Sequence, residues 1–207
     1  MNISEIEDYL EELFPNPKCE LNYSKDYELL IAVVLSAQTT DKRVNSVTEI
    51  LFKKYDTLEK MKNADIEDIK NIIKPIGTFN KKSIFVKEIA NYLIEKCNSK
   101  VPEKRDILEK IPGVGRKTAN VVLSELFNYP AIAVDTHVTR VSKRLKLAKE
   151  EDGVKEIEQK LMKKIKKDNW SRRHHQLVLF GRYYCKATKP ECNNCKIRHI
   201  CKKNNEK

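Results

Sequence analysis

The sequence predicts an all-α protein. Apolar residues recur at a spacing of three and four through nearly all of the 207 residues, which is the repeat that gives a helix one buried face. Runs that alternate apolar and polar residues, as half-buried strands do, are nearly absent. Residues that favour helix N-termini stand ahead of several of the periodic segments. We expect about ten short helices joined by short loops.

The expected helices follow one another along the chain with recognisable starts. The residues predicted to start the helices in the first half are Ser4, Thr40 or Asp41, Thr57, Asp65 and Asp106. Further helices are expected over 84–93, 117–123, 136–145 and 154–165. Proline, glycine and asparagine place loops at 15–17, 75–77, 98–102 and 128–130.

Net charge and hydropathy indicate which kinds of partner this chain can have. Its 41 Lys and Arg against 30 Asp and Glu give a formal charge of +11, which favours a polyanion, because each cation facing a phosphate releases a condensed counterion. A lysine-rich solvated surface is the alternative. The longest apolar stretch, 29–35, is too short to cross a membrane. The first eight residues are acidic and no apolar signal region follows, so we expect a cytoplasmic protein.

A tight turn at 112–115 is the most specific backbone feature. Residues 108–111 end one short helical segment and Lys117 lies in the next, which is a helix-hairpin-helix pattern. Gly113 and Gly115 lack the Cβ atoms that would hold a phosphate away, and the amides at the start of the following helix carry partial positive charge. Such a hairpin grips a nucleic-acid backbone without reading bases. The alternative is a plain Gly-x-Gly turn between packed helices.

Lys117 follows this turn directly, and a carboxylate, Asp135, lies eighteen residues further along the chain. A lysine amine is nucleophilic only when neutral, and partial burial together with the positive end of the following helix would favour the neutral form. Asp135 could accept a proton or stabilise positive charge as a glycosidic bond breaks. It could also be the N-cap of the helix over 136–145, and both roles are compatible, because a cap would fix the direction of the carboxylate.

Four of the six cysteines crowd the C-terminus: Cys185, Cys192, Cys195 and Cys201. This seventeen-residue segment cannot build an apolar core of its own, and disulfides are a poor explanation without an export signal, so the thiolates are expected to bind metal. The spacing alone is compatible with tetrahedral zinc and with a [4Fe-4S] cluster. Lys186 and Lys189 lie in the first loop of this segment, where they could meet DNA phosphates or merely offset the charge of the thiolates.

Four blocks of sequence together resemble the endonuclease III family, bifunctional DNA glycosylases and abasic-site lyases of the helix-hairpin-helix superfamily. The blocks are residues 35–41, 111–120, 133–138 and 181–185, the last with the 6-2-5 spacing of the cysteines. The resemblance covers nearly the whole chain. It implies that the cluster is [4Fe-4S] rather than zinc. It also implies a two-lobed fold, with a six-helix domain over 22–130 and an iron–sulfur domain formed by 1–21 and 131–207.

The resemblance implies the chemistry as well. Lys117 on one wall of the cleft between the lobes would attack C1′ of a nucleotide flipped out of the duplex, with Asp135 assisting from the other wall. The resulting Schiff base would undergo β-elimination, which cuts the strand 3′ of the lesion. The implied substrates are oxidised pyrimidines and abasic sites in double-stranded DNA. The implied state is a monomer associated with the nucleoid.

The residues expected to contact DNA come from the hairpin, two loops and the cysteine segment. They are Gln38, Ile76, Thr78, Gly113, Val114, Gly115, Arg116, Lys186 and Lys189. Thr78 stands where bacterial members of the family carry an intercalating leucine, and it is a poorer apolar wedge. Ile76 or Phe79 would then fill the opened stack together with Gln38, unless Phe79 belongs to the core.

Three alternatives to this function can be named, two of them within the superfamily and one from a different class. Relatives that remove adenine from mismatches share the cysteine spacing, but they lack the hairpin lysine and carry a catalytic glutamate at the position of Val33. Mismatch thymine glycosylases typically carry tyrosine at the position of Lys117. A lysine here therefore favours lyase activity. The alternative from a different class is a non-catalytic DNA-binding module in which the metal centre only supports a phosphate grip.

Overall fold

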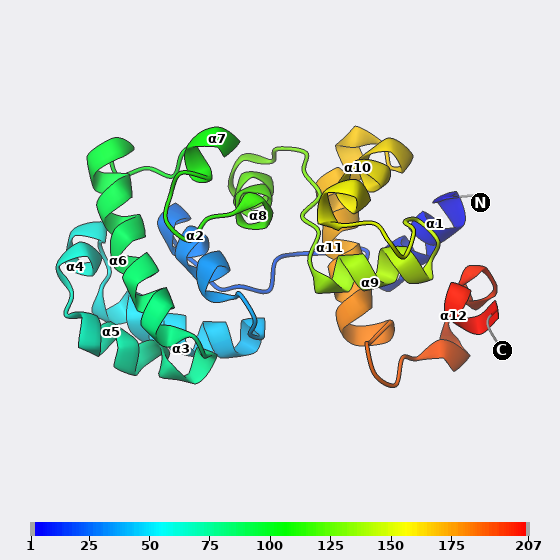
Figure 1. Cartoon of the computed structure of the whole chain (residues 1–207), viewed down its shortest axis with the longest axis horizontal. Coiled ribbons are helices and arrows are strands. Elements are labelled where there is room, and N and C mark those ends of the chain that lie inside the picture. The colour runs from blue at the N-terminus through cyan, green and yellow to red at the C-terminus, as the bar shows by residue number, and fades with distance from the viewer. Residues whose placement is uncertain (1–2, 206–207) are drawn as a thin grey trace. The chain divides into compact units, whose positions relative to one another are not determined.

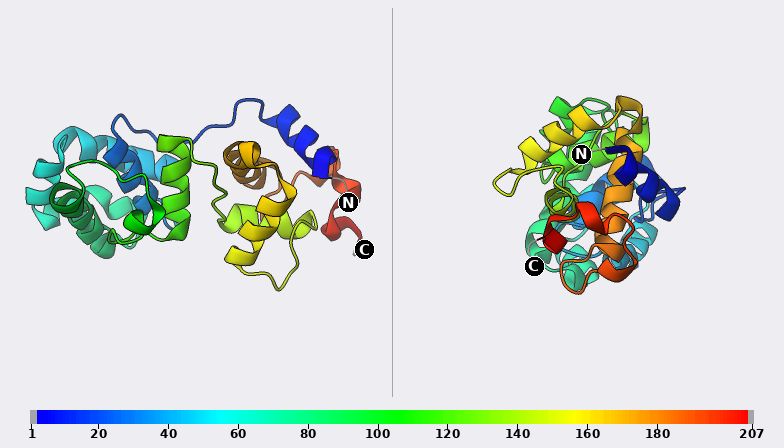
Figure 2. Two further views of the ribbon diagram at one scale, coloured as in Figure 1. Left: turned by 90° about the horizontal axis from the view of Figure 1, so that it is seen from above. Right: turned by 90° about the vertical axis from the view of Figure 1, so that its right-hand side faces the viewer.

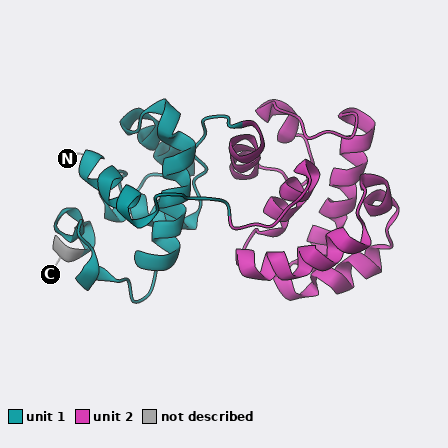
Figure 3. Cartoon of the chain, turned by 180° about the vertical axis from the view of Figure 1, so that it is seen from behind, with its two compact units in different colours: residues 1–19, 128–207 teal, residues 20–127 magenta. Residues whose placement is uncertain are grey.

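The computed structural model describes residues 3–205 and, within them, contains helices and turns but no strand. This confirms the predicted all-α class. The chain divides into two compact units, coloured in Figure 3. Unit 1 comprises Met1–Cys19 and Asn128–Lys207, and unit 2 comprises Glu20–Phe127. No helix within 3–205 is both long and apolar enough to span a lipid bilayer.

Unit 2 is built around one apolar helix. Its elements are α2 (Asp26–Leu35), α3 (Asp41–Lys54), α4 (Leu58–Asn63), α5 (Ile66–Ile73), the 3₁₀ turn η1 (Lys74–Ile76), α6 (Phe79–Lys96), α7 (Arg105–Leu108) and α8 (Arg116–Phe127). Every residue of α2 from Glu28 to Leu35 is buried, and α2 packs against α3, α6 and α8 (Figure 1). A helix that is apolar on all sides belongs at the centre of a unit, which explains the apolar run in the sequence.

Three of the predicted helix starts are confirmed as N-caps. Thr40 Oγ1 accepts a hydrogen bond from the Arg43 amide, and the side chains of Thr57 and Asp65 cap α4 and α5 in the same manner. The prediction for Asp106 is wrong: α7 begins one residue earlier, after Lys104, and Asp106 lies in its first turn. Ser4 likewise lies within α1, which begins at Ile3. An acidic or hydroxyl side chain in a first turn and one at the cap look alike in sequence, because both positions favour the same residue types.

Unit 1 joins the N-terminal helix to the C-terminal third of the chain. Its elements are α1 (Ile3–Leu13), α9 (Thr136–Arg144), α10 (Val154–Lys164), η2 (Lys167–Asn169), α11 (Trp170–Leu179), the π-helical turn η3 (Phe180–Tyr184), η4 (Cys192–Asn194), η5 (Arg198–Ile200) and α12 (Lys202–Asn205). Figures 1 and 2 show α1 beside the C-terminal segment, where Tyr9 Oη donates to the Asn194 carbonyl oxygen at 3.2 Å. One apolar core, which includes Leu10 and Phe180, joins α1, α9, α10, α11 and η3.

An ionic network fastens α1 to α11 beside this core. Arg173 donates to Glu7 at 3.0 Å and to Glu11 at 2.7 Å, while Gln176 and Arg172 also donate to Glu11. These donors, Arg172 first and then Gln176 and Arg173, lower the pKa of Glu11 from 4.5 to about 2. Charged contacts therefore stabilise unit 1 in addition to its apolar core.

Candidate active site

The hairpin of unit 2 is a tight turn between α7 and α8. The Val114 amide donates to the Ile111 carbonyl oxygen at 3.0 Å, and Val114 itself is buried, so this side chain anchors the turn. Gly113 has φ +82°, and a Cβ atom there would lie 2.8 Å from the ring of Phe85. A Cβ atom on Gly115 would have no neighbour within 4 Å. Gly113 is thus needed for the turn itself, whereas Gly115 leaves open space beside the start of α8, as a phosphate-binding loop requires.

Lys117 is the second residue of α8, which confirms the helix predicted there. Its side chain is half-buried. Within residues 20–127, no backbone or side-chain group forms a hydrogen bond or an ion pair with its ammonium nitrogen, Nζ. A lysine held near the N-terminus of a helix, yet without a partner in its own unit, is able to react with an external electrophile. Arg116, directly before it, is exposed at the first position of α8.

Asp135 is the N-cap of α9 in unit 1, as the sequence predicted. Its backbone is extended (φ −107°, ψ −170°), and its Oδ1 accepts a hydrogen bond from the Val138 amide at 2.8 Å. Residues 131–134, which lead into it, are buried. The cap holds Oδ1 and fixes the orientation of the half-buried carboxylate, and within the described residues of unit 1 no group donates a hydrogen bond to Oδ2. A fixed carboxylate can stabilise developing positive charge without first reorganising.

Gln38 and Thr78, both exposed in unit 2, adopt the left-handed backbone conformation, as Asn98 and Ser99 of the same unit also do. Gln38, just beyond α2, has φ +58°, and Thr78, just before α6, has φ +44°. Non-glycine residues rarely adopt positive φ, and for a β-branched residue such as threonine the conformation is strained. Ile76, by contrast, is only 3% exposed, and Phe79 is half-buried. Among the residues considered for the opened stack, Gln38 and Thr78 are therefore the ones at the surface of unit 2.

The four C-terminal cysteines line one pocket in unit 1 together with apolar side chains. Cys201 is buried and the other three are half-buried, and Leu145, Phe180, Tyr184 and Pro190 complete the apolar part of the lining. Burial, followed by the neighbouring thiols, raises the pKa of Cys195. Within residues 3–205, no three His, Cys, Asp or Glu side chains converge closely enough to hold a metal ion directly. The donor set of four thiols around a largely apolar pocket is nevertheless the chemistry that a metal–thiolate centre requires.

The sequence did not predict the role of Arg144 in this segment. From the C-terminal end of α9, its Nη1 donates to Cys185 Sγ at 3.3 Å and to the Lys186 carbonyl oxygen at 2.8 Å. Of the two lysines proposed to meet DNA from this loop, Lys186 pairs with Glu191 at 2.9 Å, and Lys189 is exposed with φ +47°. An arginine 41 residues away in the sequence gives no local signal of such a contact.

Comparisons with known proteins agree on one family. The family model described as "HhH-GPD superfamily base excision DNA repair protein" matches residues 31–167. Endonuclease III of Bacillus subtilis (strain 168) is 46% identical over 98% of this chain and 94% of the relative, and endonuclease III of Escherichia coli (strain K12) is 45% identical over 95% and 93%.

Two solved structures give the same result in three dimensions. A non-covalent endonuclease III–DNA complex superposes with a TM-score of 0.96 at 48% identity, covering 99% of this chain and 95% of the other. A trapped endonuclease III–DNA covalent intermediate superposes with a TM-score of 0.95 at 46% identity, covering 100% and 98%. A thermostable thymine-DNA glycosylase, at 23% identity and a TM-score of 0.85, shares the fold.

Proposed function

Since the chain belongs to the HhH-GPD superfamily of base-excision DNA repair proteins, and within it to the endonuclease III family, we propose that it is a DNA glycosylase with abasic-site lyase activity on damaged pyrimidines and that Lys117 is its nucleophile. The observation that carries this proposal is the position of Lys117, half-buried at the start of α8 with no partner in its own unit. The covalent DNA intermediate solved for a relative requires such a nucleophile.

The reaction follows from an amine and a carboxylate. The damaged nucleotide leaves the stack, because its C1′ is out of reach inside the duplex. Neutral Lys117 attacks C1′, the bond from C1′ to the base breaks, and the base departs with the bonding electron pair and takes up a proton. Loss of the amine proton and opening of the sugar ring leave a Schiff base. Removal of a C2′ proton then expels the 3′ phosphate, which cuts the strand on that side.

Asp135 has two simultaneous roles in this proposal. As the N-cap of α9 it holds the helix start, and as a fixed carboxylate it stabilises positive charge on the sugar and accepts a proton from the attacking amine. The cap is the reason that the carboxylate has one orientation before substrate arrives. Preorganised charge of this kind is usually the largest electrostatic contribution to catalysis.

The DNA contacts divide by kind. The hairpin residues Gly113, Val114, Gly115 and Arg116 would hold phosphates through backbone amides and charge, and Lys186 and Lys189 would add phosphate contacts from the cysteine loop. Gln38 and Thr78, at the surface on left-handed backbone, would enter the space that the flipped nucleotide vacates. Ile76 would support the second loop from the core. The substrate is double-stranded DNA, and we expect the protein to act on the nucleoid in the cytoplasm as a monomer.

We further propose that Cys185, Cys192, Cys195 and Cys201 hold a [4Fe-4S] cluster. In favour are the four thiols around one apolar pocket and the donation from Arg144 to Cys185 Sγ, which stabilises a thiolate. When bound, the cluster would cross-link a segment whose η4 and η5 turns have no buried residue. In this proposal unit 1 is the iron–sulfur domain and unit 2 is the helix-hairpin-helix domain. A purified protein with one zinc in place of about four irons would contradict it.

Borohydride trapping tests the nucleophile. Wild-type protein, Lys117→Ala and Lys110→Ala are each mixed with duplex DNA that contains one abasic site, and the Schiff base is reduced to a stable adduct. Lys110 is an exposed lysine just before the hairpin and serves as the matched control. We expect an adduct with wild type and Lys110→Ala and none with Lys117→Ala. A non-catalytic DNA-binding module would give no adduct with any of the three, and an adduct that persists in Lys117→Ala would assign the chemistry to another amine.

A further inference from the structure

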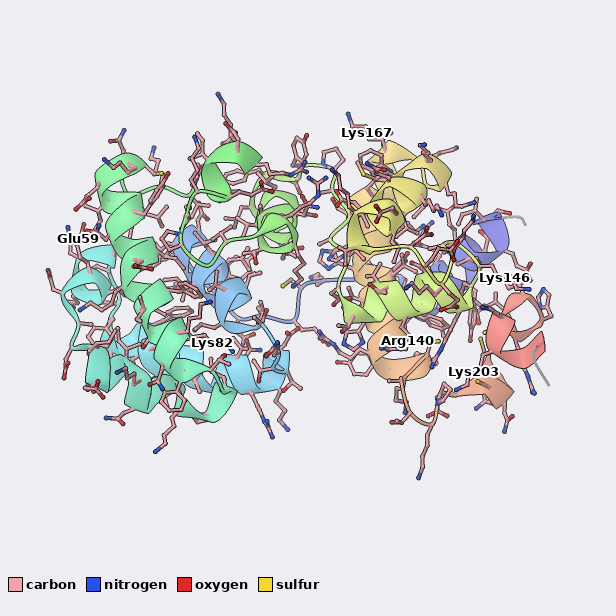
Figure 4. All side chains as sticks on the ribbon, viewed as in Figure 1. Glu59, Lys82, Arg140, Lys146, Lys167 and Lys203 are labelled. Atoms are coloured by element: carbon pink, nitrogen blue, oxygen red, sulfur yellow. The ribbon has the colours of Figure 1, made fainter. Side chains whose placement is uncertain are left out.

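A lysine in the interior of unit 2 joins the two segments that carry Gln38 and Thr78. Lys82 lies one turn into α6 and is only 4% exposed. Its Nζ donates to the Ala37 carbonyl oxygen at 2.8 Å and to the Ile76 carbonyl oxygen at 3.2 Å. Figure 4 labels Lys82 between α6 and the end of α2. One ammonium group therefore ties together backbone positions that lie about forty residues apart in the sequence.

The cost of burying this lysine indicates that the contacts are specific. Burial lowers the pKa of Lys82, and no acidic side chain within the described part of unit 2 forms an ion pair with it. A buried charge is expensive unless hydrogen bonds compensate it. By its spacing from Val86, Ile89 and Leu93, position 82 lies on the buried face of α6, where an apolar residue would pack without this cost. A lysine supplies what an apolar residue cannot, which is a charged donor for two carbonyl oxygens.

Both carbonyl oxygens lie beside strained backbone. Ala37 directly precedes Gln38, with φ +58°, and Ile76 is followed by Gly77, with φ +67°, and Thr78, with φ +44°. Strained conformations persist only where the surrounding structure holds them. The Thr78 carbonyl oxygen also accepts from the Lys82 amide at 3.1 Å, so the backbone and the side chain of the same residue hold the second segment.

We propose that Lys82 is a positioning residue that holds the Gln38 and Thr78 loops at one fixed separation, so that both side chains can enter the duplex around a flipped nucleotide. The proposal rests on the function proposed above, in which these two side chains fill the opened stack. Lys82 itself does not contact DNA or the reacting sugar, because its ammonium group is committed to the two carbonyl oxygens. Its effect is on stack opening, whereas the phosphate grip of the hairpin and the chemistry of Lys117 do not depend on it directly.

The test separates stack opening from binding. Wild type, Lys82→Met and Lys87→Met are titrated with a duplex that carries a tetrahydrofuran abasic analogue opposite 2-aminopurine, whose fluorescence rises when the base loses its stacking partners. Lys87 is the matched control, since it lies on the same helix and donates to a backbone carbonyl oxygen, that of Ala64, away from both loops. Each variant is also assayed for kcat and KM on a duplex with one damaged pyrimidine, and its fold is checked by urea unfolding.

We expect Lys82→Met to bind the duplex within about threefold of wild type, to lose at least half of the fluorescence rise, and to lose about ten- to a hundredfold in kcat, as misplaced positioning groups do. Lys87→Met should resemble wild type, and Lys82→Arg, which keeps the charge with a different reach, should recover part of the signal. A full fluorescence rise in Lys82→Met, or equal losses in both methionine variants, would overturn the inference. If Lys82→Met does not fold, Lys82→Arg and Lys82→Gln are judged by the same criteria. Failure of the proposed function would look different, because wild type itself would then give no borohydride adduct.

Discussion

Asp135 offers a substitution pair that separates structure from chemistry. Asp135→Asn keeps an Oδ1 that can accept the hydrogen bond from the Val138 amide at 2.8 Å, but it removes the charge. Asp135→Ala removes both the hydrogen-bond acceptor and the charge. Asparagine is as good an N-cap as aspartate, whereas alanine at this position costs about 1 kcal/mol of stability. The charge itself interacts with the N-terminal end of α9 by roughly 0.3–1 kcal/mol.

The two variants should therefore differ in stability and agree in activity. We expect the free energy of unfolding to fall by about 0.5 kcal/mol in Asp135→Asn and by about 1–2 kcal/mol in Asp135→Ala. For a chain of this size each kcal/mol corresponds to roughly 2–4 °C in Tm. Base release should slow by about a hundred- to ten-thousandfold in both variants, because both lack the group that accepts the proton and stabilises the charge.

Urea unfolding measures the stability, and single-turnover base release from a duplex with one damaged pyrimidine measures the rate. Thr57→Ala is the control, since Thr57 is also a helix N-cap and its hydroxyl accepts from the Lys60 amide at 3.1 Å. Thr57→Ala should lose about 1 kcal/mol of stability and keep the wild-type rate. A wild-type rate in Asp135→Asn would refute the catalytic role and leave only the cap. Equal destabilisation by asparagine and alanine would refute the account of the cap.

Four further substitutions test the hairpin and unit 1. Gly113→Ala should lower the free energy of unfolding by about 1–3 kcal/mol, because position 113 has positive φ and a Cβ atom there would lie 2.8 Å from Phe85. A Cβ atom at position 115 would have no atom within 4 Å, so Gly115→Ala should change the free energy of unfolding in urea by less than about 0.5 kcal/mol. Gly181→Ala would place a Cβ atom 2.8 Å from His137 Cβ and should cost about 1–3 kcal/mol by the same assay. The pKa of Glu11 is lowered to about 2, so the contribution of its carboxylate to stability is complete above pH 4.5 and is lost as the pH falls toward 2. Urea midpoints measured over this pH range should therefore fall less steeply in Glu11→Gln than in wild type. The account of the hairpin glycines is contradicted if Gly115→Ala is as unstable as Gly113→Ala. The account of Gly181 is contradicted if Gly181→Ala is as stable as wild type. Parallel pH profiles for Glu11→Gln and wild type would contradict the account of Glu11.

Local sequence signals predicted most of the helix starts correctly. The hydroxyls of Thr40 and Thr57 and the carboxylates of Asp65 and Asp135 all cap the helices that follow them. Asp106 does not cap α7, because an aspartate is also favoured within the first turn of a helix, where it interacts with the helix dipole. Periodicity identified the helices, because the burial of one helix face imposes it directly on the sequence.

The sequence by itself determined the helical class, the hairpin with Lys117 behind it, the cap at Asp135 and the grouping of four cysteines, because each of these depends on residues close together in the chain. Only the tertiary structure showed that the ring of Phe85 leaves no room for a Cβ atom at position 113 and that Arg144 donates to Cys185. It also showed that Lys82 joins the Gln38 and Thr78 loops. Lys82 did carry one signal, a charge on the apolar face of its helix. Its partners, however, are backbone carbonyl oxygens, which every residue possesses, so no residue type marks them in the sequence and only folding brings them together.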